Sequence, residues 1–263
     1  MLRRALILSL IAMVLAFMSL PIVAFADLPE IQRAGVLKVG VTVHDRPPFY
    51  YNYDDSLRGA EVDMIKAYAL SIGVKAEFVA KYKTHDDLVD GVWAMQVDAG
   101  WSKLNATPFR ERLVNFSNPY WTTRHALLVR KDCPDTLGQT FTGPIAVIEK
   151  TSYVRHAKEN FPQAIVIEVP DFQQTIEAVL NGTVAAAYRD EFEYLRIMQA
   201  SDYVSSQAKV HILSNPSPVA VAVPKQSKKL LASINKFIEA YQPKMTTQSL
   251  LAIERQRFKT LAD

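Results

Sequence analysis

Cysteine is almost absent from this 263-residue chain, which contains one, Cys133. A single cysteine excludes an internal disulfide. It also lies far from the apolar N-terminal segment, whereas a lipid-attached export signal needs a cysteine directly after such a segment. We therefore predict a chain that is not cross-linked, is not a lipoprotein and is not tethered by a lipid.

Motifs that carry covalent or metal chemistry are missing as well. The five histidines are scattered, and no H-x-x-x-H or C-x-x-C spacing occurs. The sequence also lacks a G-x-S-x-G elbow, a G-x-G-x-x-G fingerprint and a P-loop, so no nucleophile or phosphate cradle stands out. We expect no metal site, no cofactor and no catalytic residue.

Long hydrophobic runs are confined to the start of the chain. Residues 1–26 combine the basic Arg3 and Arg4, an apolar stretch from Leu6 to Leu20, and a small-residue end. This pattern predicts a secretory signal peptide cleaved before Asp27. The alternative is a membrane anchor, because the apolar run approaches the length that spans a bilayer. The proline at position 21 and the A-x-A end favour cleavage, and hence a periplasmic protein.

No excess of charge of one sign remains after this segment. Without Arg3 and Arg4 the chain has 28 basic and 27 acidic residues. Such a balance gives no support for nucleic acid as a partner. About 237 residues remain, which suffice for one large domain or two small ones.

The rest of the chain alternates short β-branched runs with amphipathic stretches, which is typical of α/β units. The first series of expected strands and helices covers 36–43, 59–73, 75–80, 86–96, 97–101, 107–114 and 126–131. A second series covers 143–149, 151–161, 164–170, 171–182, 184–190 and 191–200, and is followed by a strand at 219–225 and helices at 227–241 and in the tail. The pattern predicts two α/β lobes with a ligand cleft at the carboxyl ends of their strands.

Several segments, in order and spacing, resemble the periplasmic solute-binding proteins of polar amino-acid ABC transporters, the family-3 extracellular solute-binding proteins. The matching segments are LPEIQRAGVLKVGV (28–41), RPPFYY (46–51), LRGAEVDM (57–64), VDAGWSKLNATPFRERLVNFSNPYW (97–121), GPIAVIEKTSY, LNGTVAAAYRDEFEYL and VAVAVPK. The resemblance implies a two-lobed type II periplasmic-binding-protein fold, each lobe a mostly parallel sheet flanked by helices. It implies lobe 1 at 27–123 and 216–263, and lobe 2 at 124–215.

The resemblance also assigns ligand-binding residues. Arg110 matches the arginine that clamps a ligand's α-carboxylate, and its planar guanidinium suits that role. Asp190 matches the acid that takes the α-ammonium. Other expected contacts come from both lobes, namely Ser102, Lys103, Asn105, Thr151, Ser152 and Trp101. The alternatives are a surface arginine paired with Glu111, a helix-capping aspartate, and a tryptophan that simply packs.

The pocket departs from the family pattern in being polar and basic. Arg46 and His85 fall where relatives often have aromatic residues, Lys103 and Asn105 replace small hydroxyl residues, and Arg189 precedes Asp190. A ligand with a second acid group or a polar side chain fits such a pocket. The alternative is that Lys103 and Arg189 point to solvent.

Three function classes follow. The first is a monomeric binding protein that captures an amino acid or related small carboxylate by lobe closure and delivers it to an inner-membrane permease. The second is an enzyme that resembles cyclohexadienyl (arogenate or prephenate) dehydratases, with Glu193 or His85 as its acid. The third is a sensory domain that docks on another protein.

Overall fold

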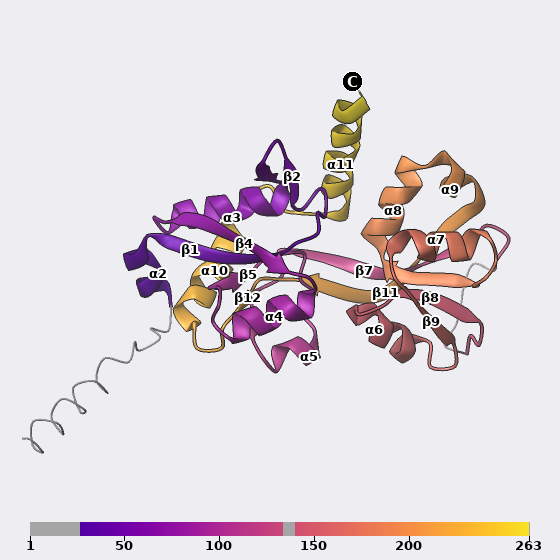
Figure 1. Ribbon diagram of the computed structural model, residues 1–263, viewed down its shortest axis with the longest axis horizontal. Coiled ribbons are helices and arrows are strands. Elements are labelled where there is room, and N and C mark those ends of the chain that lie inside the picture. The colour runs from indigo at the N-terminus through magenta and orange to yellow at the C-terminus, as the bar shows by residue number, and fades with distance from the viewer. Residues whose placement is uncertain (1–26, 134–139, 263) are drawn as a thin grey trace, which may run out of the picture.

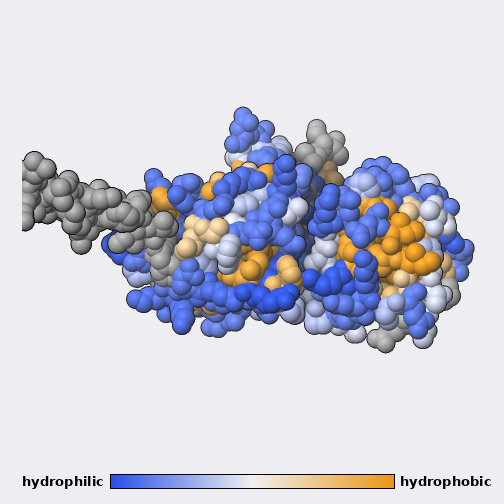
Figure 2. All heavy atoms as spheres, turned by 60° about the horizontal axis from the view of Figure 1, so that its bottom comes forward, coloured by the Kyte–Doolittle hydropathy of each residue, from blue (hydrophilic) through white to orange (hydrophobic). Residues whose placement is uncertain are grey.

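The computed structural model describes residues 27–133 and 140–262, and the predicted signal peptide lies outside these residues. The described chain forms two lobes, each with its own sheet (Figure 1). No helix in these residues is long and apolar enough to cross a membrane. The face seen in Figure 2 is mainly hydrophilic on both lobes, with a large apolar area on lobe 2 and smaller ones on lobe 1.

Lobe 1 is built on a five-stranded sheet in the order β4-β1-β5-β12-β6. Its strands are β1 (Val36–Thr42), β4 (Lys75–Tyr82), β5 (Ala99–Gly100), β6 (Asn115–Phe116) and β12 (Ala222–Val223). The flanking elements are α2 (Leu28–Ala34), the hairpin β2 (Tyr51–Tyr53) and β3 (Ser56–Arg58), α3 (Ala60–Ser71), α4 (His85–Trp93), α5 (Pro108–Glu111) and α10 (Lys228–Ala240). Helices α3 and α4 lie on opposite sides of the sheet (Figure 1).

Lobe 2 has a second five-stranded sheet in the order β11-β7-β10-β8-β9. Its strands are β7 (Trp121–Arg130), β8 (Pro144–Ile148), β9 (Ile165–Val169), β10 (Ala186–Asp190) and β11 (Ala208–Val219). Its helices are α6 (Ser152–Asn160), α7 (Phe172–Leu180), α8 (Glu191–Ala200) and α9 (Asp202–Gln207). Alternate residues of β7 belong to different hydrophobic cores. Ala126 and Leu128 belong to one core, and Leu127 and Val129 belong to the other. This period of two shows that the sheet is covered on both faces.

The two-lobed α/β architecture expected from the sequence is confirmed, with a mixture of strand directions in each sheet. In the described chain β1 pairs with β4 and β5 in parallel, and β8 pairs with β9 and β10 in parallel. The other pairings are antiparallel, because β12 returns to lobe 1 and because β7 and β11 run side by side in opposite directions.

Strands β7 and β11 carry the chain between the lobes. Trp121 belongs to the core of lobe 1, whereas Leu127 of the same strand belongs to a core of lobe 2. The predicted lobe boundaries at 123/124 and 215/216 fall where Arg124 pairs with Pro216. Helix α11 (Thr247–Ala262) contacts both parts, since Leu250 lies in the lobe 1 core and Glu254 forms an ion pair with Arg196 of α8. The exact boundaries remain a prediction.

One glycine shapes the approach to the cleft. Gly59 precedes α3 and has a φ of +126°. A Cβ at this position would lie 2.3 Å from the carbonyl oxygen of Phe49. Only glycine allows this approach, which holds the segment 46–50 against the start of α3.

Candidate functional site

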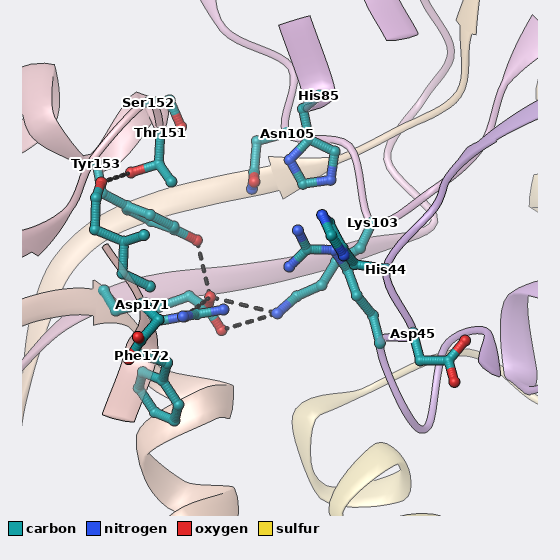
Figure 3. A pocket seen from close by; sticks show the side chains of 14 residues that line it. His44, Asp45, His85, Lys103, Asn105, Thr151, Ser152, Tyr153, Asp171 and Phe172 are labelled. Atoms are coloured by element: carbon teal, nitrogen blue, oxygen red, sulfur yellow. Dashed lines mark hydrogen bonds and ion pairs between the residues drawn. The ribbon is translucent and has the colours of Figure 1, made fainter. Parts of the chain in front are cut away.

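A cavity of about 450 Å³ lies between the lobes. Residues of both lobes line it (Figure 3), and most of them follow the carboxyl end of a strand, as expected for α/β sheets. The lining residues are His44, Asp45, Arg46, His85, Lys103 and Asn105 from lobe 1, and Ile148, Thr151, Ser152, Tyr153, Asp171, Phe172, Arg189 and Asp190 from lobe 2.

Lys103 reaches across this cavity from lobe 1 to lobe 2. It follows β5 with a left-handed backbone, φ +48°, and its backbone N–H donates to Oε1 of Glu61 over 2.7 Å. Its ammonium lies 2.8 Å from Oε1 of Glu193 and 3.4 Å from both carboxylate oxygens of Asp190. The side chain is only 5% exposed, so Lys103 does not point to solvent.

Three aromatic rings surround the same ammonium. Its nitrogen lies 5.1 Å from the centroid of the Phe49 ring, 5.3 Å from that of Phe192 and 5.8 Å from that of Trp121. The three rings also contact one another, with centroids 5.1–5.8 Å apart. Ring faces attract a cation at such distances, so the ammonium is held by charge and by the aromatic surfaces together.

The carboxylates that receive Lys103 belong to a buried ionic cluster. Asp190 caps α8 through the backbone N–H of Glu193, and Tyr153 Oη donates to its Oδ2 over 2.8 Å. Arg189 lies 3.7 Å from Asp190 Oδ2 and 3.6 Å from Glu193 Oε1. Burial raises the pKa of the Glu193 carboxyl, but Lys103, Arg189 and Arg196 outweigh burial and hold that pKa well below its usual range.

Arg189 is also enclosed rather than solvated. Its guanidinium stacks on the Phe172 ring, with 4.5 Å from Cζ to the centroid, and its side chain is 11% exposed. Burial alone would lower its pKa, but Glu193 and Asp190 outweigh burial and raise it. The sequence alone left open whether Lys103 and Arg189 point to the pocket or to solvent. Both side chains face the cavity.

Arg110 lies beside the cavity and is not among the residues that line it. It lies in the short helix α5, which Thr107 caps, and it is 3% exposed. Its Nε donates to Asp86 Oδ1 and its Nη1 to the carbonyl oxygen of Asn105, both over 2.9 Å. Nη2 has no hydrogen-bond partner within residues 27–133 and 140–262. The residue is thus a buried arginine paired with Asp86, not a surface arginine paired with Glu111.

Arg46 and His85 line the cavity from lobe 1. Nε of Arg46 is buried without a hydrogen-bond partner, and this arginine makes no ion pair with any described residue. Burial, with Arg46 and Arg110 nearby, lowers the pKa of His85 well below its usual value, so the ring is neutral. Its Nε2 lies 2.9 Å from the carbonyl oxygen of Ser102 and must therefore carry the proton.

Besides Arg110, two of the predicted ligand-binding residues do not line the cavity. Trp101 is fully buried in the core of lobe 1, where its ring packs near Tyr68 and Tyr120. Ser102 is also fully buried, and its Oγ accepts the backbone N–H of Thr42 over 3.1 Å. This placement favours packing for Trp101 and a supporting role for Ser102.

The remaining predicted residues do line the cavity. Thr151 precedes α6 and donates its hydroxyl to the carbonyl oxygen of Ile148 over 2.7 Å, and Ser152 begins that helix. Asn105 Nδ2 donates to Ser217 Oγ over 2.8 Å. Residue patterns missed His44, Asp45, Ile148, Tyr153, Asp171 and Phe172, although their positions at or just after the ends of β1, β8 and β9 could have indicated them.

The described residues hold no cluster of histidine, cysteine, aspartate and glutamate side chains that could bind a metal ion. The side chains that line the cavity offer ionic and hydrogen-bonding groups. Guanidinium groups, an ammonium, hydroxyls and amide groups converge on a small cavity, which is the donor set of a site for a small polar molecule.

The chain is similar to several known proteins. The virulence sensor protein BvgS of Bordetella pertussis is 25% identical over 80% of this chain and 17% of its own length. The probable ABC transporter extracellular-binding protein YckB of Bacillus subtilis is 24% identical over 69% of this chain and 64% of its own length. The chain thus spans less than two thirds of either relative.

Among solved structures, the ancestral amino acid-binding protein AncCDT-1, a precursor of cyclohexadienyl dehydratase, is 27% identical, with a TM-score of 0.65. That match covers 85% of this chain and 96% of the ancestral protein. The model of the bacterial extracellular solute-binding proteins, family 3, matches residues 37–253. The chain belongs to the family-3 bacterial extracellular solute-binding proteins.

Proposed function

We propose that this protein is the substrate-binding component of an ABC importer. It captures an amino acid or a related small carboxylate by closure of its lobes, and delivers the ligand to a membrane permease. The observation that carries the proposal is the cavity between the lobes, because charged side chains of lobe 1 (Arg46, Lys103) and of lobe 2 (Arg189, Asp190) meet there. A ligand that contacts both lobes favours the closed state.

The carboxylate clamp is part of this proposal. Arg110 has two of its nitrogens held by Asp86 and by the Asn105 carbonyl oxygen, which orients the guanidinium while leaving Nη2 for a ligand. Thr151 and Ser152, at the start of α6, add donors from lobe 2. We expect these groups to bind the ligand's carboxylate.

An enzyme of the cyclohexadienyl dehydratase type is a second candidate, supported by the similarity to AncCDT-1. A dehydratase needs a protonated group to donate to the leaving hydroxyl. Glu193 is a poor acid because its cationic neighbours keep it ionised, and His85 is neutral with its Nε2 proton directed at the Ser102 carbonyl. The site chemistry therefore favours binding over catalysis.

Binding and turnover can be separated in one experiment. The purified protein is titrated calorimetrically with the common amino acids, with small mono- and dicarboxylates and with prephenate, and prephenate consumption is followed by absorbance. We expect saturable binding of at least one amino acid or small carboxylate, and no consumption of prephenate. Prephenate turnover, or the absence of binding to every compound, would overturn the proposal.

Closure and delivery need two further measurements. Small-angle X-ray scattering should show a smaller radius of gyration with ligand than without it. Cells that lack the protein should lose uptake of the radiolabelled ligand, and an unchanged uptake would instead favour a sensory role, as in the relative BvgS. Intact mass of the protein recovered from the periplasm should correspond to a chain that starts at Asp27.

A further inference from the structure

The acidic groups of the cavity are already occupied by the chain itself. Asp190 accepts from Tyr153 and faces the ammonium of Lys103. Asp171 accepts from the backbone N–H and the side-chain amide of Gln174. Asp45 accepts from the backbone N–H and the side-chain amide of Asn52. An incoming ammonium group would have to share a carboxylate with these donors.

Lys103 fills the position with the strongest preference for an ammonium. Carboxylates of Asp190 and Glu193 on one side and three aromatic rings around it are the groups that recognise alkylammonium ions. This position is almost closed to water, since the Lys103 side chain is 5% exposed and Asp190 and Glu193 are 1% and 8% exposed. A second ammonium beside the first would add repulsion between like charges at low dielectric.

One cationic side chain of the cavity, by contrast, still has hydrogen-bond donors without a partner. Arg46 lines it without an ion-pair partner in the described chain, and its Nε is buried without a hydrogen bond. An unpaired guanidinium in such a place is costly unless an anion binds it. It offers a planar pair of donors, which suits a carboxylate.

From this asymmetry we infer that the ligand is a small carboxylate without an ammonium group, because Lys103 supplies that ammonium from within the chain. Arg46 binds an acid group of this ligand in addition to the one that the Arg110 clamp holds. The inference deepens the proposed function and rests on it. Lys103 is thus the residue that determines which class of acid the site accepts.

The test compares pairs of ligands with the same carbon skeleton, with and without an ammonium group. Succinate is compared with aspartate, and glutarate with glutamate, by calorimetric titration of the wild-type protein. We expect the ammonium-free acid of at least one pair to bind at least tenfold more tightly than its amino acid. Equal or tighter binding of the amino acid in every pair that binds would overturn the inference and leave the proposed function intact. Binding of none of these acids, nor of any compound in the wider screen, would overturn the proposed function with it.

The role of Lys103 itself is tested by the variant Lys103→Met, which keeps the length of the side chain and removes its charge. We expect the variant to gain affinity for the amino acid at least tenfold, and so to lose or reverse the preference. The matched control is Lys66→Met on the exposed side of α3, which should bind as the wild type does. A folded Lys103→Met protein with the wild-type preference would show that Lys103 does not set it. If the variant does not fold, the wild-type pairs decide the question.

Discussion

The carboxylate of Glu61 holds the backbone of Lys103 in place. Its Oε1 accepts the Lys103 N–H over 2.7 Å and also accepts the hydroxyl of Tyr120. Glu61 is fully buried in the first turn of α3. Because Lys103 has a left-handed backbone conformation that few side chains adopt readily, this acceptor fixes the direction in which the lysine enters the cavity.

The same contact predicts a pH dependence of stability. Burial raises the pKa of Glu61 from 4.5 to about 7, although Tyr120, Lys103 and Arg46 oppose the shift. The unfolded chain loses this proton near pH 4.5 and the folded chain only near pH 7. Glu61 therefore lowers the free energy of unfolding as pH rises between these values, by roughly 3 kcal/mol.

Glu61→Gln removes this titration while keeping an oxygen for both donors. In urea melts, the free energy of unfolding of the wild type should fall between pH 4.5 and pH 7. We expect this fall to be smaller in the variant by about 2–3 kcal/mol. Glu77→Gln on the exposed side of β4 is the control and should follow the wild type. Parallel pH profiles for Glu61→Gln and the wild type would contradict the prediction.

Two variants can distinguish a direct role of Arg110 in binding the carboxylate from a role in holding the local structure. Arg110→Ala removes the guanidinium and should weaken carboxylate binding by about 2–5 kcal/mol in calorimetry, because it leaves a desolvated anion without its partner. Asp86→Asn removes only the charge that pairs with Nε, and Asp86 is 57% exposed. We expect that variant to bind within a fewfold of the wild type.

Two results would contradict the clamp. One is affinity that survives Arg110→Ala within a fewfold. The other is an equal loss in Arg110→Ala and Asp86→Asn, since it would mean that the pair matters only for holding the carbonyl of Asn105. Circular dichroism of both variants establishes that they are folded.

Local sequence patterns were enough to predict the α/β rhythm of this fold. The expected strand at 36–43 and helix at 59–73 correspond to β1 and α3, because their apolar residues follow the periods of strand and helix. The hairpin formed by β2 and β3 was not predicted. Its strands have three residues each and are mostly exposed, so they carry too little apolar alternation to be recognised.

The site was predictable only in part. Seven of the ten proposed ligand residues line the cavity, and they are Arg46, His85, Lys103, Asn105, Thr151, Ser152 and Asp190. A residue pattern says which position a side chain occupies but not what it contacts. The pairing of Lys103 with Glu193 joins residues 90 positions apart, and Trp101 packs near Tyr68 of α3 and Tyr120. Such contacts arise only when the lobes are assembled.

Arg46 should influence which ligands are accepted. Arg46→Tyr removes the unpaired guanidinium from the cavity and introduces an aromatic ring. We expect the affinity for a dicarboxylate to fall at least tenfold relative to the matching monocarboxylate, measured by calorimetry, because a charge-assisted hydrogen bond is lost. The control Arg58→Tyr lies on the exposed hairpin strand β3 and should keep the wild-type ratio. An unchanged ratio in Arg46→Tyr would remove Arg46 from the binding site.

Asp27, the first residue after the predicted cleavage point, joins the two ends of lobe 1. Its Oδ1 accepts the backbone N–H groups of Leu28 over 2.9 Å and of Leu230 over 2.7 Å, so that one carboxylate serves the first turns of both α2 and α10. Asp27→Ala should lower the free energy of unfolding by about 2 kcal/mol in urea melts, since capping substitutions cost about 0.5–2 kcal/mol. The control Asp202→Ala, at an exposed helix start without such a contact, should cost less than about 1 kcal/mol. Equal losses in the two variants would mean that Asp27 does not link the helices.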